Sequence, residues 1–203
     1  MKIENFIPQT YQDTLERVML SLDFPWFYNT QTSVYSGNDL STGSVFLDNN
    51  TEDKPQFIHI FYENGNPTSN YFGMVQPMIY LLEQKIGKTI SNNIFRIKAN
   101  LLYQDSSYAK DMHNIIHIDT PSIDESYKSF LYYVNSSDGD TLVYNETVKD
   151  KPKCLTIKTK NTPEKGTGLF FDSDVYHCST PPVITKTRVV INFVLKETQN
   201  DFR

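Results

Sequence analysis

The stretch Asn114-Ile-Ile-His117-Ile-Asp119-Thr-Pro121 places a histidine and an aspartate two residues apart in a short apolar segment. Its apolar residues predict a β-strand over 115–118, which the Thr-Pro pair ends. Because side chains at positions i and i+2 of a strand point to the same face, His117 and Asp119 would lie side by side. One imidazole and one carboxylate are two of the three ligands of a facial iron(II) site, and a second histidine would complete it.

A second histidine is available further along the chain. The segment Gly168-Leu-Phe-Phe-Asp-Ser-Asp-Val-Tyr-His177 runs from an apolar strand through an acidic turn to His177. His177 lies far enough beyond His117 in the sequence for several strands to lie between them. Those strands can bring His177 back beside His117 and Asp119. A His-x-Asp triplet alone is a weak signal in a chain with four histidines, so the predicted site depends on this context.

Arg188 comes next, immediately before the apolar run Val189–Leu195. A cation at the start of a buried strand is costly unless an anion meets it. That anion is either an internal carboxylate or the carboxylate of a ligand. The planar guanidinium suits a ligand, because it can bind a carboxylate through two hydrogen bonds.

The composition favours a β-rich globular protein, since the 203 residues include 13 Tyr and 13 Phe. The net charge of −5, without a dense Lys/Arg run, disfavours nucleic acid as a partner. Cys154 and Cys178 lack a framework spacing and are expected to be reduced thiols. The N-terminal residues lack the apolar core of a signal peptide, and the apolar segments are too short to span a bilayer. We therefore expect a soluble cytoplasmic protein, with no indication of its oligomeric state.

Periodicity predicts two helices followed by a run of strands. Amphipathic spacing predicts helices over 9–22, with Thr10 as the N-cap, and over 71–86, with Gly87 at its end. Pro77 would start the second helix or kink it. Strands are predicted over 56–62, 94–103, 115–118, 129–134, 141–144, 154–157, 168–171 and 189–195. Short strands at this spacing predict a sandwich or open barrel, with the helices as a layer outside the sheet.

These motifs resemble the iron(II)- and 2-oxoglutarate-dependent dioxygenases, in particular their prolyl 4-hydroxylase-like branch. The resemblance covers residues 94–195 and rests on the order His-x-Asp, His, Arg. Residues 131–135 and 138–141 resemble the family's Tyr-Leu-Asn strand and Gly-Gly-x-Thr turn, although Asp140 replaces the second glycine. Around the second histidine, residues 169–174 and 180–182 are also similar to the family, although Ser179 stands where the family has an apolar residue.

The resemblance implies a mostly β fold, a double-stranded β-helix (jelly roll) with a supporting layer of N-terminal helices. It implies that His117, Asp119 and His177 bind Fe(II). It also implies that Arg188 binds the distal carboxylate of 2-oxoglutarate. We expect a single domain over 1–203, with a helical and loop support region (1–93), a catalytic core (94–196) and a polar tail (197–203).

Two tyrosines are assigned to the co-substrate by the same resemblance. Tyr133 matches a strand tyrosine that hydrogen-bonds the distal carboxylate in some members, and Tyr103 matches a tyrosine near the co-substrate. For each, packing in the core is an equal alternative. The segment 104–112 is longer than the family's connection, which blurs the match of Tyr103, and with 34–50 it is a candidate substrate-side loop.

The implied reaction is hydroxylation of an unactivated C–H bond, with O2 as co-substrate and decarboxylation of 2-oxoglutarate to succinate and CO2. The implied substrate is a peptidyl proline or a similar group, or a small molecule. Two alternatives stay open: a non-catalytic jelly-roll binding module, in which the histidines are incidental, and a cupin-type metalloprotein. The cupin pattern requires His-x-His and a glutamate, whereas this chain has His-x-Asp. A binding module has no need of three ligands and Arg188 in this order, so the enzyme is favoured.

Overall fold

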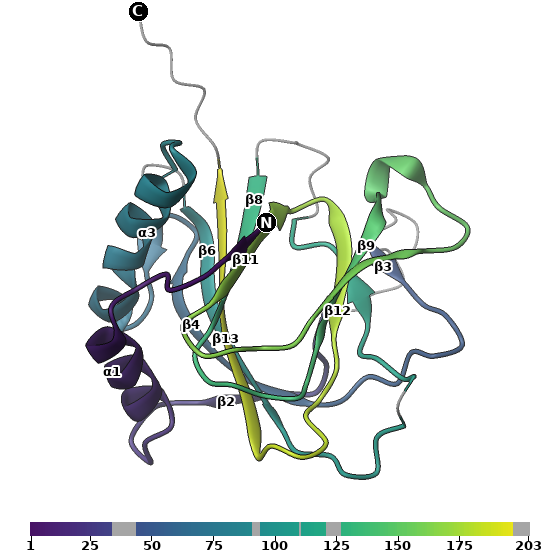
Figure 1. The fold of residues 1–203 in the computed structure, drawn as a ribbon, viewed down its shortest axis with the longest axis horizontal. Helices are drawn as coiled ribbons and strands as arrows, with labels where there is room; N and C mark the ends of the chain where they lie inside the picture. Colours follow the sequence, from purple (N-terminus) through teal and green to yellow (C-terminus); the bar gives the residue numbers. More distant parts are fainter. Residues whose placement is uncertain (34–43, 91–93, 110, 121–126, 197–203) are drawn as a thin grey trace, which may run out of the picture.

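The computed structural model describes residues 1–33, 44–90, 94–109, 111–120 and 127–196. The strands dominate and form two antiparallel sheets (Figure 1), which confirms the mostly β class. In chain order the elements are β1 (Lys2–Ile3), α1 (Gln9–Met19), β2 (Phe27–Asn29), β3 (Val45–Phe46), β4 (Gln56–Glu63), β5 (Asn66–Pro67), α3 (Phe72–Ile86), β6 (Ile94–Tyr103), β7 (Ile116–His117), β8 (Tyr127–Tyr133), β9 (Thr141–Thr147), the 3-10 turn η1 (Val148–Asp150), β10 (Ile157–Asn161), β11 (Gly168–Asp172), β12 (Val175–Ser179) and β13 (Thr187–Lys196).

The larger sheet has the order β1-β11-β8-β13-β6-β4-β2, with β5 paired to β4, and the smaller sheet has the order β10-β9-β12-β7-β3. Consecutive strands from β6 onward repeatedly change sheet, so each sheet is assembled from segments that are distant in the sequence. An apolar cluster drawn from both sheets, including Leu131, Val143 and Val190, packs between them. The sheets therefore share an interior, into which one face of each strand points.

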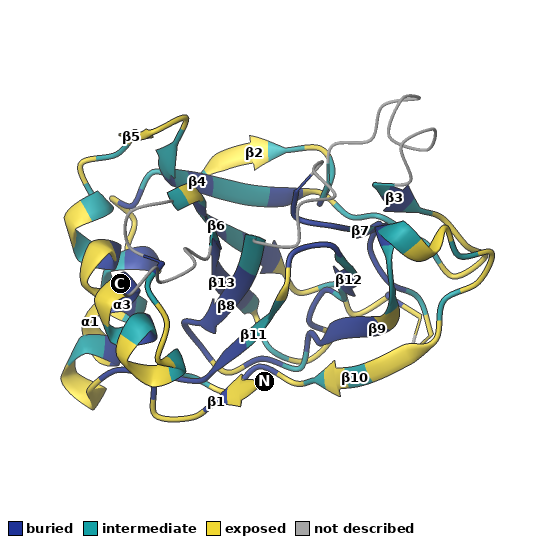
Figure 2. Ribbon diagram, turned by 90° about the horizontal axis from the view of Figure 1, so that it is seen from above, coloured by how far each residue is buried: buried dark blue, intermediate teal, exposed yellow. Residues whose placement is uncertain are grey.

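Helices α1 and α3 pack on the outer face of the larger sheet (Figures 1 and 2). Leu15 of α1 and Leu82 of α3 are completely buried there, in one cluster with Ile97 of β6 and Ile191 of β13. Because strand side chains alternate, the residues between these apolar positions face the other way, toward the smaller sheet. This alternation decides which residues of β6 and β13 can reach the interior.

The two predicted helices are present, but the end and the N-cap of the first differ from the prediction. The first ends at Met19 rather than residue 22, and Pro8, not Thr10, is its N-cap. Pro8 is extended, with φ −56° and ψ 147°, so the helix begins directly after it and Thr10 already lies in the first turn. Gly87 ends α3 in the left-handed conformation, with φ 68°, as predicted. Pro77 lies inside α3.

The strand predictions fail where apolar residues are scarce. The strand predicted at 154–157 is wrong, because β10 covers Ile157–Asn161, an edge strand rich in Lys and Thr. β12 was not predicted, and residues 1–93 contribute β1 to β5 in addition to helices. The predicted loop 34–50 contains β3, although 34–43, like the tail 197–203, lie outside the described residues. The described part of 104–112 holds neither helix nor strand.

The cysteines and the helices of the described residues bear on two further predictions. Cys154 and Cys178 are both free thiols, the first exposed and the second buried. None of the described helices has the length and apolar character needed to cross a membrane.

His59 of β4 is a packed, hydrogen-bonded histidine, as its lone position on a strand indicated. Its ring nitrogens lie 2.8 Å from the carbonyl oxygen of Pro25 and 2.7 Å from Oγ of Ser69. Burial lowers the pKa of His59 below its ordinary value. The native ring thus stays neutral while the unfolded ring takes up a proton, so the free energy of unfolding falls as the pH drops through the ordinary histidine pKa.

We expect this loss of stability between about pH 7 and about pH 5 to be smaller in His59→Gln, which cannot titrate there. Urea unfolding of both proteins at the two pH values measures the difference. An equal loss in both would contradict the assignment.

Candidate metal and co-substrate site

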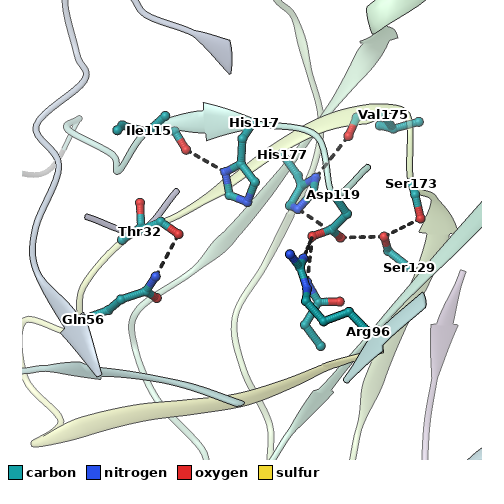
Figure 3. Close-up of polar contacts among 11 residues, drawn as sticks. Thr32, Gln56, Arg96, Ile115, His117, Asp119, Ser129, Ser173, Val175 and His177 are labelled. Carbon is teal, nitrogen blue, oxygen red and sulfur yellow. Dashed lines mark hydrogen bonds and ion pairs between the residues drawn. The ribbon is translucent and has the colours of Figure 1, made fainter. Parts of the chain in front are cut away.

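The two predicted histidine ligands face each other across neighbouring strands. β12 pairs antiparallel with β7, and His177 lies directly opposite His117 in the register. Their ring centroids are 4.6 Å apart. In each ring Nδ1 contacts the carbonyl oxygen two residues earlier, at 2.9 Å for Ile115 and 3.0 Å for Val175 (Figure 3). Nδ1 therefore carries the proton and donates it, which leaves both Nε2 atoms available to a metal.

Asp119 completes the group from just beyond the end of β7. The strand covers 116–117 rather than the predicted 115–118, but the Asp119 backbone N–H donates to the carbonyl of Ser173 at 3.1 Å and holds the following bend in place. Oδ2 of Asp119 then lies 3.5 Å from Nε2 of His177. The ligand atoms of His117, Asp119 and His177 all lie within 4.8 Å of one another. The structure thus brings the three predicted metal ligands together.

Polar side chains that sequence reasoning missed hold the Asp119 carboxylate. Ser129 Oγ donates to Oδ2 at 2.5 Å (Figure 3). Asn192 Nδ2 donates to Oδ1 at 2.8 Å. Ser173 Oγ lies 2.8 Å from Ser129 Oγ, and Arg96 approaches Oδ1 at 3.4 Å. A signal for Asn192 was present in the sequence, because it is the one polar residue inside the apolar run 189–195.

The protonation states suit a divalent metal. Burial, together with the neighbouring His177, lowers the pKa of His117 to about 3, so its ring is neutral near pH 7. Burial opposes ionisation of Asp119, but His177 and Arg96 more than offset it and the pKa of Asp119 is lowered. Neutral imidazole and ionised carboxylate are the forms that ligate metal, and two histidines with one carboxylate fit iron(II).

We expect Asn192→Ala to weaken iron(II) binding by about 10- to 100-fold, because the carboxylate loses a donor that orients it. Anaerobic calorimetric titration measures the affinity. Asn145→Ala is a matched control, since Asn145 is exposed and contacts Thr156 instead. Equal affinities in the two variants would show that Asn192 does not position Asp119.

A cavity of about 230 Å³ lies in front of the three ligands. Its wall includes the apolar side chains of Leu102, Leu131 and Val190, and the polar side chains of Lys98 and Arg188. The cavity is large enough for a small organic acid beside a metal ion.

Arg188 lies at the other end of this cavity and is 4% exposed. Its Nε donates to the carbonyl of Gly139 at 2.8 Å, and an Nη donates to Thr141 Oγ1 at 2.6 Å. Tyr133 is buried beside it and donates to the same Thr141 oxygen at 2.9 Å. Burial lowers the pKa of Arg188, but a guanidinium stays charged in proteins. Within the described residues, the hydrogen-bond partners of the Arg188 guanidinium are a carbonyl and a hydroxyl, and it pairs with no carboxylate.

The turn that carries Gly139 fixes the position of Arg188. The Asp138 carboxylate accepts backbone N–H groups of Val183, Ile184 and Thr185 at 2.8 to 2.9 Å. These bonds hold the chain before β13 against the turn after β8. A side chain at position 139 would have no room, since its Cβ would lie 2.7 Å from the carbonyl oxygen of Thr180 and 2.9 Å from Cδ of Arg188.

We expect Gly139→Ala to displace the Arg188 side chain and weaken 2-oxoglutarate binding by about tenfold or more, while iron(II) binding persists. Calorimetry with each ligand separates the two effects. Gly73→Ala serves as the control, because a Cβ there meets nothing within 4 Å. Unchanged 2-oxoglutarate affinity in Gly139→Ala would contradict the packing argument.

The structure does not bring Tyr103 to the cavity, and Tyr133 reaches it only through its hydrogen bond to the lining residue Thr141. Tyr103 is 56% exposed, and its ring contacts Phe57 at a centroid distance of 5.4 Å. Leu102, one position earlier on β6, lines the cavity. Strand alternation therefore turns Tyr103 outward, and its assignment to the co-substrate is corrected.

No family model and no curated protein matches this sequence. Solved structures do match its fold. The α-ketoglutarate-dependent epimerase SnoN from nogalamycin biosynthesis aligns with a TM-score of 0.59 at 9% identity, over 96% of this chain and 76% of that chain. A Trichoplax adhaerens prolyl hydroxylase, in complex with a hypoxia inducible factor peptide, aligns with a TM-score of 0.57 at 14% identity, over 97% and 83%. A Pseudomonas putida prolyl-4-hydroxylase aligns with a TM-score of 0.50 at 13% identity, over 98% and 92%.

At these identities the likeness concerns the fold. The chain folds as a double-stranded β-helix, as predicted, and this is the fold of solved oxygenases that depend on iron and 2-oxoglutarate.

Proposed function

We propose that this protein is an iron(II)- and 2-oxoglutarate-dependent dioxygenase that hydroxylates an unactivated C–H bond. One observation carries the proposal: His117, Asp119 and His177 converge at one end of a cavity whose other end holds Arg188, which pairs with no carboxylate among the described residues. The fold shared with solved oxygenases supports it.

Each residue then has a defined task. Nε2 of His117, Nε2 of His177 and the Asp119 carboxylate would hold the iron. When bound, the iron supplies O2 activation coupled to decarboxylation of 2-oxoglutarate to succinate and CO2. Arg188 binds the distal carboxylate of 2-oxoglutarate, and Thr141 and Tyr133 keep the guanidinium in position.

The substrate we propose is a prolyl residue of a peptide or a similar side chain. The sequence resemblance to prolyl 4-hydroxylases supports this class, and one solved structure of the same fold holds a peptide. The net charge of −5 argues against nucleic acid.

Anaerobic titration with iron(II) and then 2-oxoglutarate tests the proposal through the weak visible charge-transfer absorption of the iron–2-oxoglutarate complex. We expect the wild type to show the band and His177→Ala to lose it, because a ligand is missing. Arg188→Ala should still bind iron, which also shows that it folds, but should need about 10- to 100-fold more 2-oxoglutarate.

Arg17→Ala is the matched control, since Arg17 is exposed on α1. A wild type that binds neither iron nor 2-oxoglutarate would reject the enzyme and favour the non-catalytic jelly-roll binding module.

A further inference from the structure

A row of polar side chains on β6 faces the cavity, and of these the proposed reaction uses only Arg96, through its contact with Asp119. Arg96, Lys98 and Asn100 occupy alternate positions of this strand and line the cavity. The intervening residues Ile97 and Ala99 are completely buried on the opposite face, against the helices. The strand thus places polar groups toward the interior at three successive inward positions, where apolar residues would cost less.

Several atoms of this row lack partners. Arg96 Nε and Asn100 Oδ1 are buried and make no hydrogen bond to any described residue. The same is true of Oδ1 of Asn192, which lies opposite Lys98 in the register. The Lys98 ammonium has neither a hydrogen bond nor an ion pair within the part of the chain that the structure describes. Because buried polar groups in proteins are normally satisfied, this group of donors and acceptors fits a bound polar ligand.

The charge of the cavity favours an anion as that ligand. Among the described residues that line it, Arg96, Lys98 and Arg188 are cations and Asp119 is the one carboxylate. A divalent metal and dianionic 2-oxoglutarate would cancel each other and leave this excess unchanged. Burial and Arg96 lower the pKa of Lys98 to about 8, against opposing effects of Asp119 and Glu63. The ammonium is thus desolvated and repelled, and an anion would relieve both costs.

This region is separate from the position of the 2-oxoglutarate carboxylate. Arg188 lies opposite Leu102 in the register, whereas Asn192 lies opposite Lys98. Four residues along a strand correspond to about 13 Å. Arg96 and Asn192 both contact Asp119, so the row lies at the metal end of the cavity. A carboxylate bound by the row would therefore lie at the metal end, apart from the distal carboxylate that Arg188 would bind.

We propose that Arg96, Lys98 and Asn100 form a subsite for a carboxylate on the substrate, close to the carbon that is oxidised. This inference rests on the proposed function. This subsite would narrow the proposed substrates to molecules that carry a carboxylate. A chain that ends in proline is one example.

The test is calorimetric titration of the full chain, saturated with 2-oxoglutarate so that the Arg188 end is occupied. The probes are N-acetyl-L-proline, which carries a carboxylate, and N-acetyl-L-prolinamide, which does not. We expect the wild type to bind the acid more tightly than the amide. Lys98→Met should bind the acid about tenfold or more weakly, and Lys98→Arg should recover much of the affinity. Lys153→Met, which removes an exposed lysine outside the cavity lining, should match the wild type.

Equal binding of acid and amide, no binding of the acid, or equal acid binding by wild type and Lys98→Met would each overturn the subsite. These results are distinct from failure of the proposed function, which would appear as an absence of 2-oxoglutarate binding in the same titrations. Loss of acid binding in Arg188→Ala, with Lys98→Met unaffected, would place the acid at the Arg188 end and also overturn the subsite.

Discussion

The pairing of β7 with β12 is the constraint on which the site depends. These two short strands lie inside the smaller sheet, and their register sets His117 directly opposite His177. Backbone hydrogen bonds fix this spacing before any metal binds, and the carbonyl contacts of each Nδ1 fix the ring orientation. A slip of one residue would turn either histidine to the other face of the sheet. The candidate metal site is therefore a consequence of strand register rather than of side-chain flexibility.

The same alternation gives each sheet an outer apolar face and an inner face that carries the polar groups of the cavity beside an apolar cluster. On the larger sheet, one face packs against α1 and α3, and on the smaller sheet Tyr144, Tyr176 and Cys178 form a separate apolar cluster. The opposite faces point into the shared cavity and carry the ionisable groups. Buried charge is costly, so the cations and the carboxylate are sustained by hydrogen bonds and by the ligands that they would bind. The two packed faces stabilise the fold and allow the interior to be polar.

Sequence reasoning succeeded where a local pattern was sufficient. The His-x-Asp pair, the distal histidine and the arginine before an apolar strand were recognisable because their order and their immediate neighbours identified them. Sequence reasoning failed where the prediction depended on which face of a strand a side chain occupies. Tyr103 was assigned to the cavity, but it follows a lining residue on the same strand and therefore points outward. β12, the strand that carries His177, was missed because its residues Val-Tyr-His-Cys-Ser mix polar and apolar types without a clear period.

The sequence by itself determined the β-rich class and singled out the candidate ligands and Arg188, because these follow from residue type and local order. The tertiary structure decided which of those residues meet, and which others join them. Ser129, Asn192 and Arg96 support Asp119 from β8, β13 and β6, and no local pattern connects them. Lys98 likewise lies opposite Asn192 of β13, a pairing that no local pattern indicates. Long-range register and the direction of each side chain set these contacts, and both arise only when the two sheets assemble.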